Sequence, residues 1–342
     1  MGNVRARAIG AAGGAVLVTA LFMTGCSAVA SRSSGPSAVV ATIPVSDFGT
    51  GIALTPDGTR AYVAAGAKVL VIDTATNQVA STINVGDMPY AVAMSPDGMR
   101  VYAIDLMQRE VWMIDTTSNS VVRRVDLGEP RRPVLRPGVA VSPDGTKVYA
   151  TLSQPEGAGA DLLYTIDAVT GAKEQRSLDF HPGQLVAGKD GRLVWVAGCR
   201  GMCSDGALHG IDPANPGQAI QLTLPTVPGG VDVSPDGARV YVTNGLDASV
   251  SVADVGAQRI VTSVRVGAEP LGVTTSPDGT RVYVTNFQSN TLTVIDTATN
   301  TVAGQLEVGP TPRAIAITPD GRHAYLTHST PQVSVVDLSQ VE

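Results

Sequence analysis

The residues most capable of chemistry in this sequence include a close pair of cysteines. Cys199 and Cys203 lie four positions apart in a glycine-rich segment, and two nearby cysteines form a disulfide in an oxidising compartment. Zinc is the sharper alternative, with His209 as the nearby candidate ligand, but no pair of further ligands stands at ligand spacing. The spacing therefore favours a disulfide, and we expect no metal site and no cofactor.

Arginines form the second group. Arg131, Arg132 and Arg136 gather in one proline-rich segment, and Arg313 stands near the C-terminus. Guanidinium forks suit carboxylate or phosphate groups. The group therefore indicates a site for an anionic ligand, and solvated loop residues are the alternative interpretation.

The composition of the chain indicates the class of fold that must position these residues. The chain has 342 residues, 44% of them hydrophobic, with 37 Gly, 22 Pro and a net charge of −6. There is ample chain for a large core, and so much Gly and Pro favours many short strands and turns. The acidic balance argues against broad binding to a nucleic-acid backbone.

The N-terminus has the pattern of an export signal. Arg5 and Arg7 precede an apolar run of 16 residues, which is short for a membrane span but typical of a signal peptide over residues 1–25. The run ends in a segment that resembles a bacterial lipobox, in which Cys26 becomes the lipidated N-terminus. Cleavage a few residues later, with soluble secretion, is the alternative. Residues 26–37 then form a flexible tether.

A repeat with a three-part period fills the rest of the chain. A Pro-Asp-Gly turn, degenerate in one copy, starts at Pro56, Pro96, Pro143, Lys189, Pro235, Pro277 and Pro319. An aromatic follows at Tyr62, Tyr102, Tyr149, Trp195, Tyr241, Tyr283 and Tyr325. An apolar run then ends at Asp73, Asp115, Asp167, Asp212, Asp254, Asp296 and Asp337. About 40 residues with four short strands predict one β-propeller blade per period.

Two copies carry the resemblance to a known family. Residues 240–244 and 282–286 both read Val-Tyr-Val-Thr-Asn, which is similar to the name-giving motif of the YVTN β-propeller repeat family. The resemblance covers residues 38–342 and implies an all-β, seven-bladed propeller of four-stranded blades. Relatives include surface proteins, binding proteins and lactonase-like enzymes, so the fold alone does not give a function.

The two ends of the repeat region predict how the ring closes. Residues 38–45 look like a fourth strand without a blade before it, and the last blade, residues 313–337, has three strands. We expect the N-terminal strand to complete the C-terminal blade, which removes an exposed sheet edge.

The repeat already explains most polar and aromatic residues. The Asp residues of both turn types are turn formers, and the repeat aromatics pack between blades. What departs from the repeat lies on one face, which we call the top face: it carries the loops between the second and third strands and the linkers between blades. Three long segments there, 128–137, 152–161 and 198–208, lie over blades 3 and 4.

Unusual side chains fall on the same predicted face. They are Phe48, Tyr90, Phe180, His181, Phe287, Arg313 and His328. Loops on a rigid scaffold are where binding residues concentrate. We therefore expect a binding site of Arg131, Arg132, Arg136, His181, Arg313, His328, Tyr90 and Phe287.

The sequence has no hydrolase, phosphate-loop or zinc-protease motif. Residues 309–314 resemble a Gly-Pro-Arg-His stretch of propeller lactonases, but Ala314 replaces the His. Asp232 is an acid among small residues near the axis. Burial there could raise its pKa and make it a base, or it could be hydrogen-bonded to a neighbouring blade.

These patterns favour a monomeric, extracytoplasmic binding or scaffolding module held at the cell membrane by a lipid anchor, with its ligand or partner on the top face over blades 3 and 4. Its partner is then an envelope protein or a small anionic ligand. A lactonase-like hydrolase or isomerase, with Asp232 as its candidate residue, is the alternative. Binding of single-stranded nucleic acid is a second alternative, and the charge disfavours it.

Overall fold

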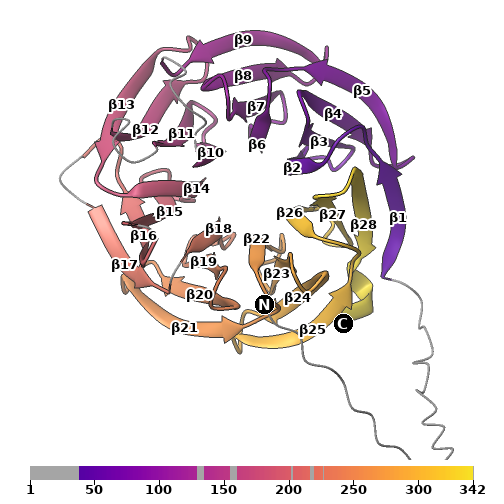
Figure 1. Ribbon diagram of the computed structural model, residues 1–342, viewed down its shortest axis with the longest axis vertical. Coiled ribbons are helices and arrows are strands. Elements are labelled where there is room, and N and C mark those ends of the chain that lie inside the picture. The colour runs from indigo at the N-terminus through magenta and orange to yellow at the C-terminus, as the bar shows by residue number, and fades with distance from the viewer. Residues whose placement is uncertain are drawn as a thin grey trace, which may run out of the picture. The chain divides into compact units, whose positions relative to one another are not determined.

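The computed structural model describes residues 38–128, 135–154, 160–201, 203–215, 219–225 and 227–341. The predicted signal peptide, the tether and Cys26 lie outside these residues. Seven four-stranded antiparallel sheets surround a central axis, as Figure 1 shows. This confirms the predicted seven-bladed propeller. In the described part of the chain, no helix is long and apolar enough to cross a membrane.

Each blade runs from an inner strand at the axis to an outer strand at the rim. Blades 1 to 3 contain β2 (Gly49–Leu54), β3 (Arg60–Ala65), β4 (Lys68–Asp73), β5 (Gln78–Asn84), β6 (Pro89–Met94), β7 (Arg100–Asp105), β8 (Glu110–Asp115), β9 (Ser120–Asp126), β10 (Leu135–Val141), β11 (Lys147–Ser153), β12 (Asp161–Asp167) and β13 (Lys173–Leu178). Blades 4 and 5 contain β14 (His181–Ala187), β15 (Val194–Arg200), β16 (Asp205–Ile211), β17 (Ala219–Leu224), β18 (Pro228–Val233), β19 (Arg239–Asn244), β20 (Ser249–Asp254) and β21 (Arg259–Arg265). Blades 6 and 7 contain β22 (Pro270–Thr275), β23 (Arg281–Asn286), β24 (Thr291–Asp296), β25 (Thr301–Glu307), β26 (Pro312–Ile317), β27 (His323–His328) and β28 (Gln332–Asp337).

The seventh blade is completed by the start of the chain. Strand β1 (Val39–Pro44) pairs antiparallel with β28, and a short 3-10 turn (Leu338–Val341) follows it. Ile43 is buried against Val333 and Val335 of that blade. The predicted closure is therefore confirmed, and the seventh sheet has the order β1-β28-β27-β26.

The Pro-Asp-Gly turns are built as the sequence indicates. Gly279 adopts a φ of 74°, a left-handed conformation that favours glycine. Asp278 accepts a hydrogen bond from the Ser276 hydroxyl at 2.5 Å and from the Thr280 amide at 3.0 Å. These bonds hold the pKa of Asp278 below its usual value, led by that from Ser276. Such Asp residues form turns, and this structural role accounts for them.

Neighbouring blades are joined by the Thr and Tyr of the repeat. The Thr285 hydroxyl accepts from the Gly272 amide at 2.9 Å and donates to the Arg313 carbonyl of the next blade at 2.5 Å. The Tyr325 hydroxyl donates to Asn77 Oδ1 of blade 1 at 2.7 Å. Burial raises the pKa of Tyr325 to about 12, so this donor stays protonated. The inner strands are consequently held in fixed positions around the axis.

Candidate functional site

A channel of about 460 Å³ lies between the inner strands, and residues from all seven blades line it. Its lining includes three of the predicted binding residues, Tyr90, Phe287 and Arg313. They come from blades 2, 6 and 7. The structure thus brings together side chains that lie far apart in the sequence, at the mouth of the channel on the top face.

Local backbone contacts position these three side chains. Tyr90 follows the first residue of β6, where the chain turns from the linker into the inner strand. The Phe287 amide donates to the Glu269 carbonyl at 2.9 Å, which ties the β23–β24 loop to the linker before β22. Arg313 lies in β26 and donates from one guanidinium nitrogen to Ser329 Oγ at 3.2 Å. All three side chains are half-buried, so each keeps a solvent-facing part.

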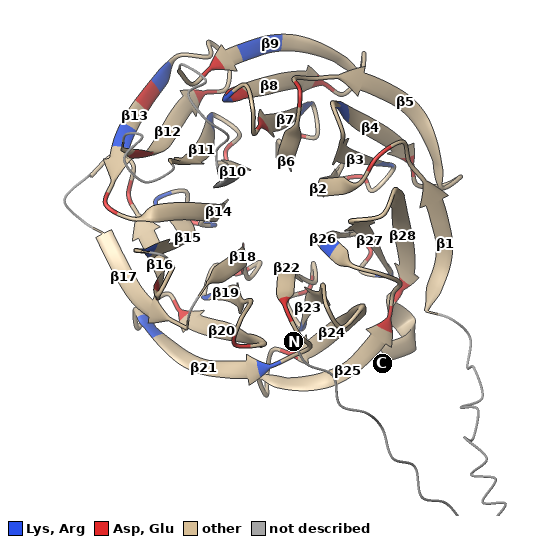
Figure 2. Ribbon diagram, in the orientation of Figure 1, with Lys and Arg blue, Asp and Glu red and all other residues tan. Residues whose placement is uncertain are grey.

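The channel wall itself is poor in charge. The acidic and basic side chains on the seven inner strands are those of Arg136, His181, Asp232 and Arg313. Figure 2 shows blue on β26 beside the axis, while most inner strands are tan. Glu269, on an exposed linker, is a further acid in the channel lining. Arg313 therefore faces a channel in which few other charges compete for an anion.

Glycines allow the inner strands of neighbouring blades to approach closely along the channel. A β-carbon on Gly272 would lie 2.4 Å from the Arg313 carbonyl oxygen, and one on Gly230 would lie 2.4 Å from the Leu271 carbonyl oxygen. Such distances leave no room for a side chain. The close packing of these strands fixes the backbone from which the Arg313 side chain extends into the channel.

Asp232 lines the same channel from β18. Its carboxylate accepts hydrogen bonds from the Thr275 amide at 2.7 Å and the Thr275 hydroxyl at 3.0 Å. Burial raises the pKa of Asp232, while the bonds from Thr275 act in the opposite direction. The carboxyl thus joins blades 5 and 6, which is the structural alternative that the sequence left open, and it still faces the channel.

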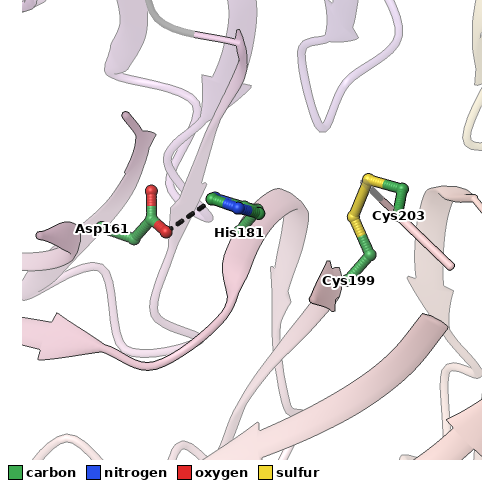
Figure 3. The surroundings of a disulfide bond; sticks show 4 residues. All are labelled: Asp161, His181, Cys199 and Cys203. Carbon is green, nitrogen blue, oxygen red and sulfur yellow. Dashed lines mark ion pairs between the residues drawn. A yellow bond between two sulfur atoms is a disulfide. The ribbon is translucent and has the colours of Figure 1, made fainter. Parts of the chain in front are cut away.

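The junction of blades 3 and 4 holds a second polar cluster, shown in Figure 3. His181 Nδ1 lies 2.8 Å from Asp161 Oδ2, and Asp161 Oδ1 accepts from the Gln154 amide at 2.6 Å. Burial raises the pKa of Asp161, and its hydrogen bonds oppose that rise. The acid fixes the orientation of the half-buried imidazole of His181.

This cluster extends to a buried arginine that sequence reasoning missed. Arg109 is 5% exposed, and one of its terminal nitrogens donates to Gln154 Oε1 at 3.1 Å. Its Nε has no hydrogen-bond partner among the residues that the structure describes. Arg109 has a φ of 58°, as Asn290 does at 60° in a corresponding loop. A positive φ is uncommon for arginine and more common for asparagine. An arginine at this turn position is therefore the sequence feature that could have drawn attention to Arg109.

Two predicted top-face residues are buried instead. His328 is fully buried at the end of β27, and its Nδ1 lies 2.6 Å from the Pro310 carbonyl oxygen. Burial lowers the pKa of His328, so its imidazole holds the linker as a neutral group. Phe180 is 4% exposed and stacks on His209, with ring centroids 3.6 Å apart. His328 ends strand β27 and Phe180 lies in the linker before β14, and both side chains turn inward, away from solvent.

The structure joins Cys199 and Cys203 by a disulfide with an S–S distance of 2.00 Å. Among the described residues, no group of three or more His, Cys, Asp or Glu side chains is placed to hold a metal. Arg131 and Arg132 lie outside the described residues. Arg136 lies in β10, and its side chain is also outside what the structure describes.

Comparison with known proteins supports the fold and says little about the site. Residues 218–342 match the family of the cytochrome D1 heme domain. No curated protein matches the chain in sequence. A chain of hydrazine synthase from Kuenenia stuttgartiensis is similar in structure, with a TM-score of 0.75 and 17% identity over 86% of this chain and 96% of that chain. At that identity the likeness shows a shared propeller fold.

Proposed function

We propose that this protein is an extracytoplasmic binding or scaffolding module whose ligand enters the channel mouth on the top face. The observation that carries the proposal is the convergence of Arg313, Tyr90 and Phe287 on one channel. An anionic group pairs with the guanidinium of Arg313, and the two rings contact an apolar or planar part of the ligand. The chemistry fits a small carboxylate or phosphate compound, or an acidic side chain of an envelope protein.

Glu269 limits which anions fit this site. Glu269, an exposed acid, is among the residues that line the same channel as Arg313, and like charges repel. A ligand with a single negative group near Arg313 avoids that repulsion. The proposed ligand is therefore a compact anion with one acidic group and an apolar body rather than a polyanion, which also disfavours single-stranded nucleic acid.

The place of the protein in the cell is part of the proposal. A signal peptide over residues 1–25 and lipidation of Cys26 would hold a monomeric propeller at the membrane surface through the tether. Incorporation of labelled fatty acid into the wild type, and its loss in Cys26→Ala, tests the anchor. Release of unlabelled wild-type protein into the medium would support soluble secretion instead.

A haem, which the name of the matched family suggests, does not fit the channel. His, Cys, Met and Tyr side chains are the usual protein ligands of haem iron. The lining residues of the channel include no His, Cys or Met, and Tyr90 is the one phenol among them. Of the four histidines, His181 is paired with Asp161, His209 and His328 are buried, and His323, at the start of β27, is not among the residues that line the channel. We therefore assign no haem chemistry to these residues.

A lactonase-like hydrolase or isomerase is the second candidate, and one observation favours it. Asp232 faces the same channel with its pKa raised by burial, as a general base requires. Turnover of a panel of lactones that is lost in Asp232→Asn would establish this candidate. Binding of the same compounds without turnover would leave the binding function.

Thermal shift with small carboxylates, sugar phosphates, lactones and envelope fragments tests the binding proposal. A ligand at a hundred times its Kd stabilises the folded state by about 2.7 kcal/mol. The shift should be lost in Arg313→Ala and retained in Arg259→Ala, an exposed arginine on the rim strand β21.

A variant with Arg131, Arg132 and Arg136 all changed to Ala tests the remaining predicted arginines. A ligand shift that survives this triple variant and disappears in Arg313→Ala places the anion in the channel alone. A shift that survives both variants would refute the cationic site.

A further inference from the structure

The face opposite the top face carries the Pro-Asp-Gly turns. On this face, contacts between the turns of neighbouring blades form a ring around the axis. In most blades, the glycine of the turn packs on the residue that opens the turn of the preceding blade. A β-carbon added to Gly58 would lie 2.8 Å from Pro319 Cδ. One added to Gly98 would lie 2.8 Å from Pro56 Cδ. The corresponding distances for the later blades run from 3.2 to 3.9 Å at Gly145, Gly237, Gly279 and Gly321.

The ring of contacts is broken at one place. A β-carbon on Gly191 of blade 4 would meet nothing within 4 Å, whereas the repeat would place it against Pro143 of blade 3. Blade 4 is also the blade in which Lys189 replaces the turn proline. The seam between blades 3 and 4 is therefore open on this face.

The face of blade 3 that borders this seam is polar where other blades are apolar. Thr165 pairs with Tyr149 on the neighbouring strand. The residue in the same position of other blades is Val71, Met113, Val252, Val294 or Val335, each at most 2% exposed. Blade 4 has Gly210, which the ring of Trp195 covers. Thr165 is half-buried rather than fully buried, so the opening of the seam coincides with a change of residue type.

The open seam forms a cleft of about 630 Å³. Its charged lining residues are Lys147, Asp167, Lys173, Glu174, Arg192 and Asp212. Lys147 and Arg192 are basic, and Asp167, Glu174 and Asp212 are acidic, so the cleft presents charges of both signs. The ammonium of Lys173 instead donates to the Asp126 carbonyl and lies 5.9 Å from the centre of the Tyr164 ring, on the face of blade 3 toward blade 2. Thr165, Thr170 and Asn215 add neutral donors and acceptors, and Tyr149 adds an aromatic ring.

Several of these groups are fixed in place by the turns around the cleft. Lys147 Nζ lies 3.2 Å from Asp167 Oδ2. Asp212 accepts from the Asn215 side chain at 3.0 Å. Glu174 and Arg192 are exposed at opposite sides of the seam, one on β13 and one in the blade 4 turn. The cleft thus presents donors and acceptors held in place by hydrogen bonds, next to the exposed side chains of Glu174 and Arg192, which can adjust to a ligand.

We propose that this cleft is a binding site for a neutral polyhydroxylated ligand of the saccharide class. A hydroxyl both donates and accepts hydrogen bonds, so it matches a wall in which ammonium, guanidinium, amide and carboxylate groups alternate. A strong anion would meet three carboxylates, and a cation would meet Lys147 and Arg192. The lining therefore favours a ligand with many hydroxyls and no net charge, and the site is separate from the channel mouth.

Saturation-transfer NMR and calorimetry with maltose, cellobiose and N,N′-diacetylchitobiose test this site, with inorganic phosphate and glycylglycine as contrasting probes. At least one disaccharide should bind to the purified protein. Its affinity should fall at least about tenfold in Glu174→Ala and in Arg192→Ala, since each removes a charge-assisted hydrogen bond. Arg322→Ala is the matched control, because Arg322 is an exposed residue at the same position of the blade 7 turn.

Thr165→Val provides a second test that does not depend on charge. It restores the apolar residue found in other blades and should weaken saccharide binding while the protein still unfolds cooperatively. No saccharide binding with a Kd below about 10 mM would overturn the proposal. Displacement of the bound saccharide by inorganic phosphate, or equal loss in Arg322→Ala, would also overturn it.

Discussion

The state of His209 gives a prediction that can be worked out in free energy. His209 lies in β16, is 4% exposed and stacks on Phe180. Burial, aided by the charge of Arg200, lowers the pKa of His209 to about 4 from its ordinary value of 6.5. The folded protein therefore keeps a neutral imidazole at a pH where the unfolded chain already binds a proton.

The consequence is a loss of stability in mild acid. Between pH 6.5 and 4 the unfolded state binds more protons at this position, so the free energy of unfolding falls as the pH falls. A shift of about 2.5 pH units at 1.36 kcal/mol each corresponds to a loss of about 3 kcal/mol. Below pH 4 both states are protonated, and the loss from His209 stays constant.

Urea unfolding followed by tryptophan fluorescence across pH 4 to 7 measures this effect. Trp195 is buried in the same blade and reports on it. His209→Phe keeps an aromatic ring against Phe180 and removes the titration. The wild type minus variant difference in unfolding free energy should fall by about 3 kcal/mol from pH 7 to pH 4. A difference that is constant across this range would refute the reasoning.

Three further predictions concern the scaffold. Thr285→Val leaves the Gly272 amide and the Arg313 carbonyl without their partner, so urea unfolding should show a loss of about 2 kcal/mol; an unchanged midpoint would contradict the role of this threonine between blades. Deletion of residues 38–46 removes the strand that completes blade 7, and size-exclusion chromatography should show aggregated or unfolded protein, whereas a soluble product with a cooperative melt would argue against the closure. Cys203→Ser opens a short loop and should cost about 2 kcal/mol of stability; reductant should lower the wild type by the same amount, and a wild type insensitive to reductant would rule out a stabilising bridge.

The architecture was predictable because the same sequence pattern of turns and strands occurs in every blade. The Pro-Asp-Gly turn, the aromatic residue and the strand-ending Asp recur in register, and each has a local physical cause. Asp278 is held by the residues two positions away on either side. The closure followed from counting strands at the two ends, which β1 and β28 confirm.

Side-chain directions at the linkers were not predictable in the same way. His328 and Phe180 stand in segments assigned to the top face, yet both turn into the protein. Asp161, Gln154 and Arg109 come together from two blades, and neither their spacing nor the repeat indicates that contact. Such clusters depend on how blades are placed around the axis, which local patterns do not specify.

The convergence at the channel was partly predictable. Tyr90, Phe287 and Arg313 were singled out because they depart from the repeat, and the structure adds that they line one channel. The sequence alone predicted a ligand over blades 3 and 4, and that position stays a prediction. The channel itself was not predicted, because inner strands from all blades meet at the axis and residues of distant blades become neighbours there.

A crystal structure of the protein with the compound that gives the largest thermal shift tests the central claim most directly. The account predicts density in the channel, with the acidic group against the guanidinium of Arg313 and the body of the ligand against Tyr90 or Phe287. Density for the compound at the blade 3–4 seam or elsewhere on the surface, with the channel mouth empty, would contradict it.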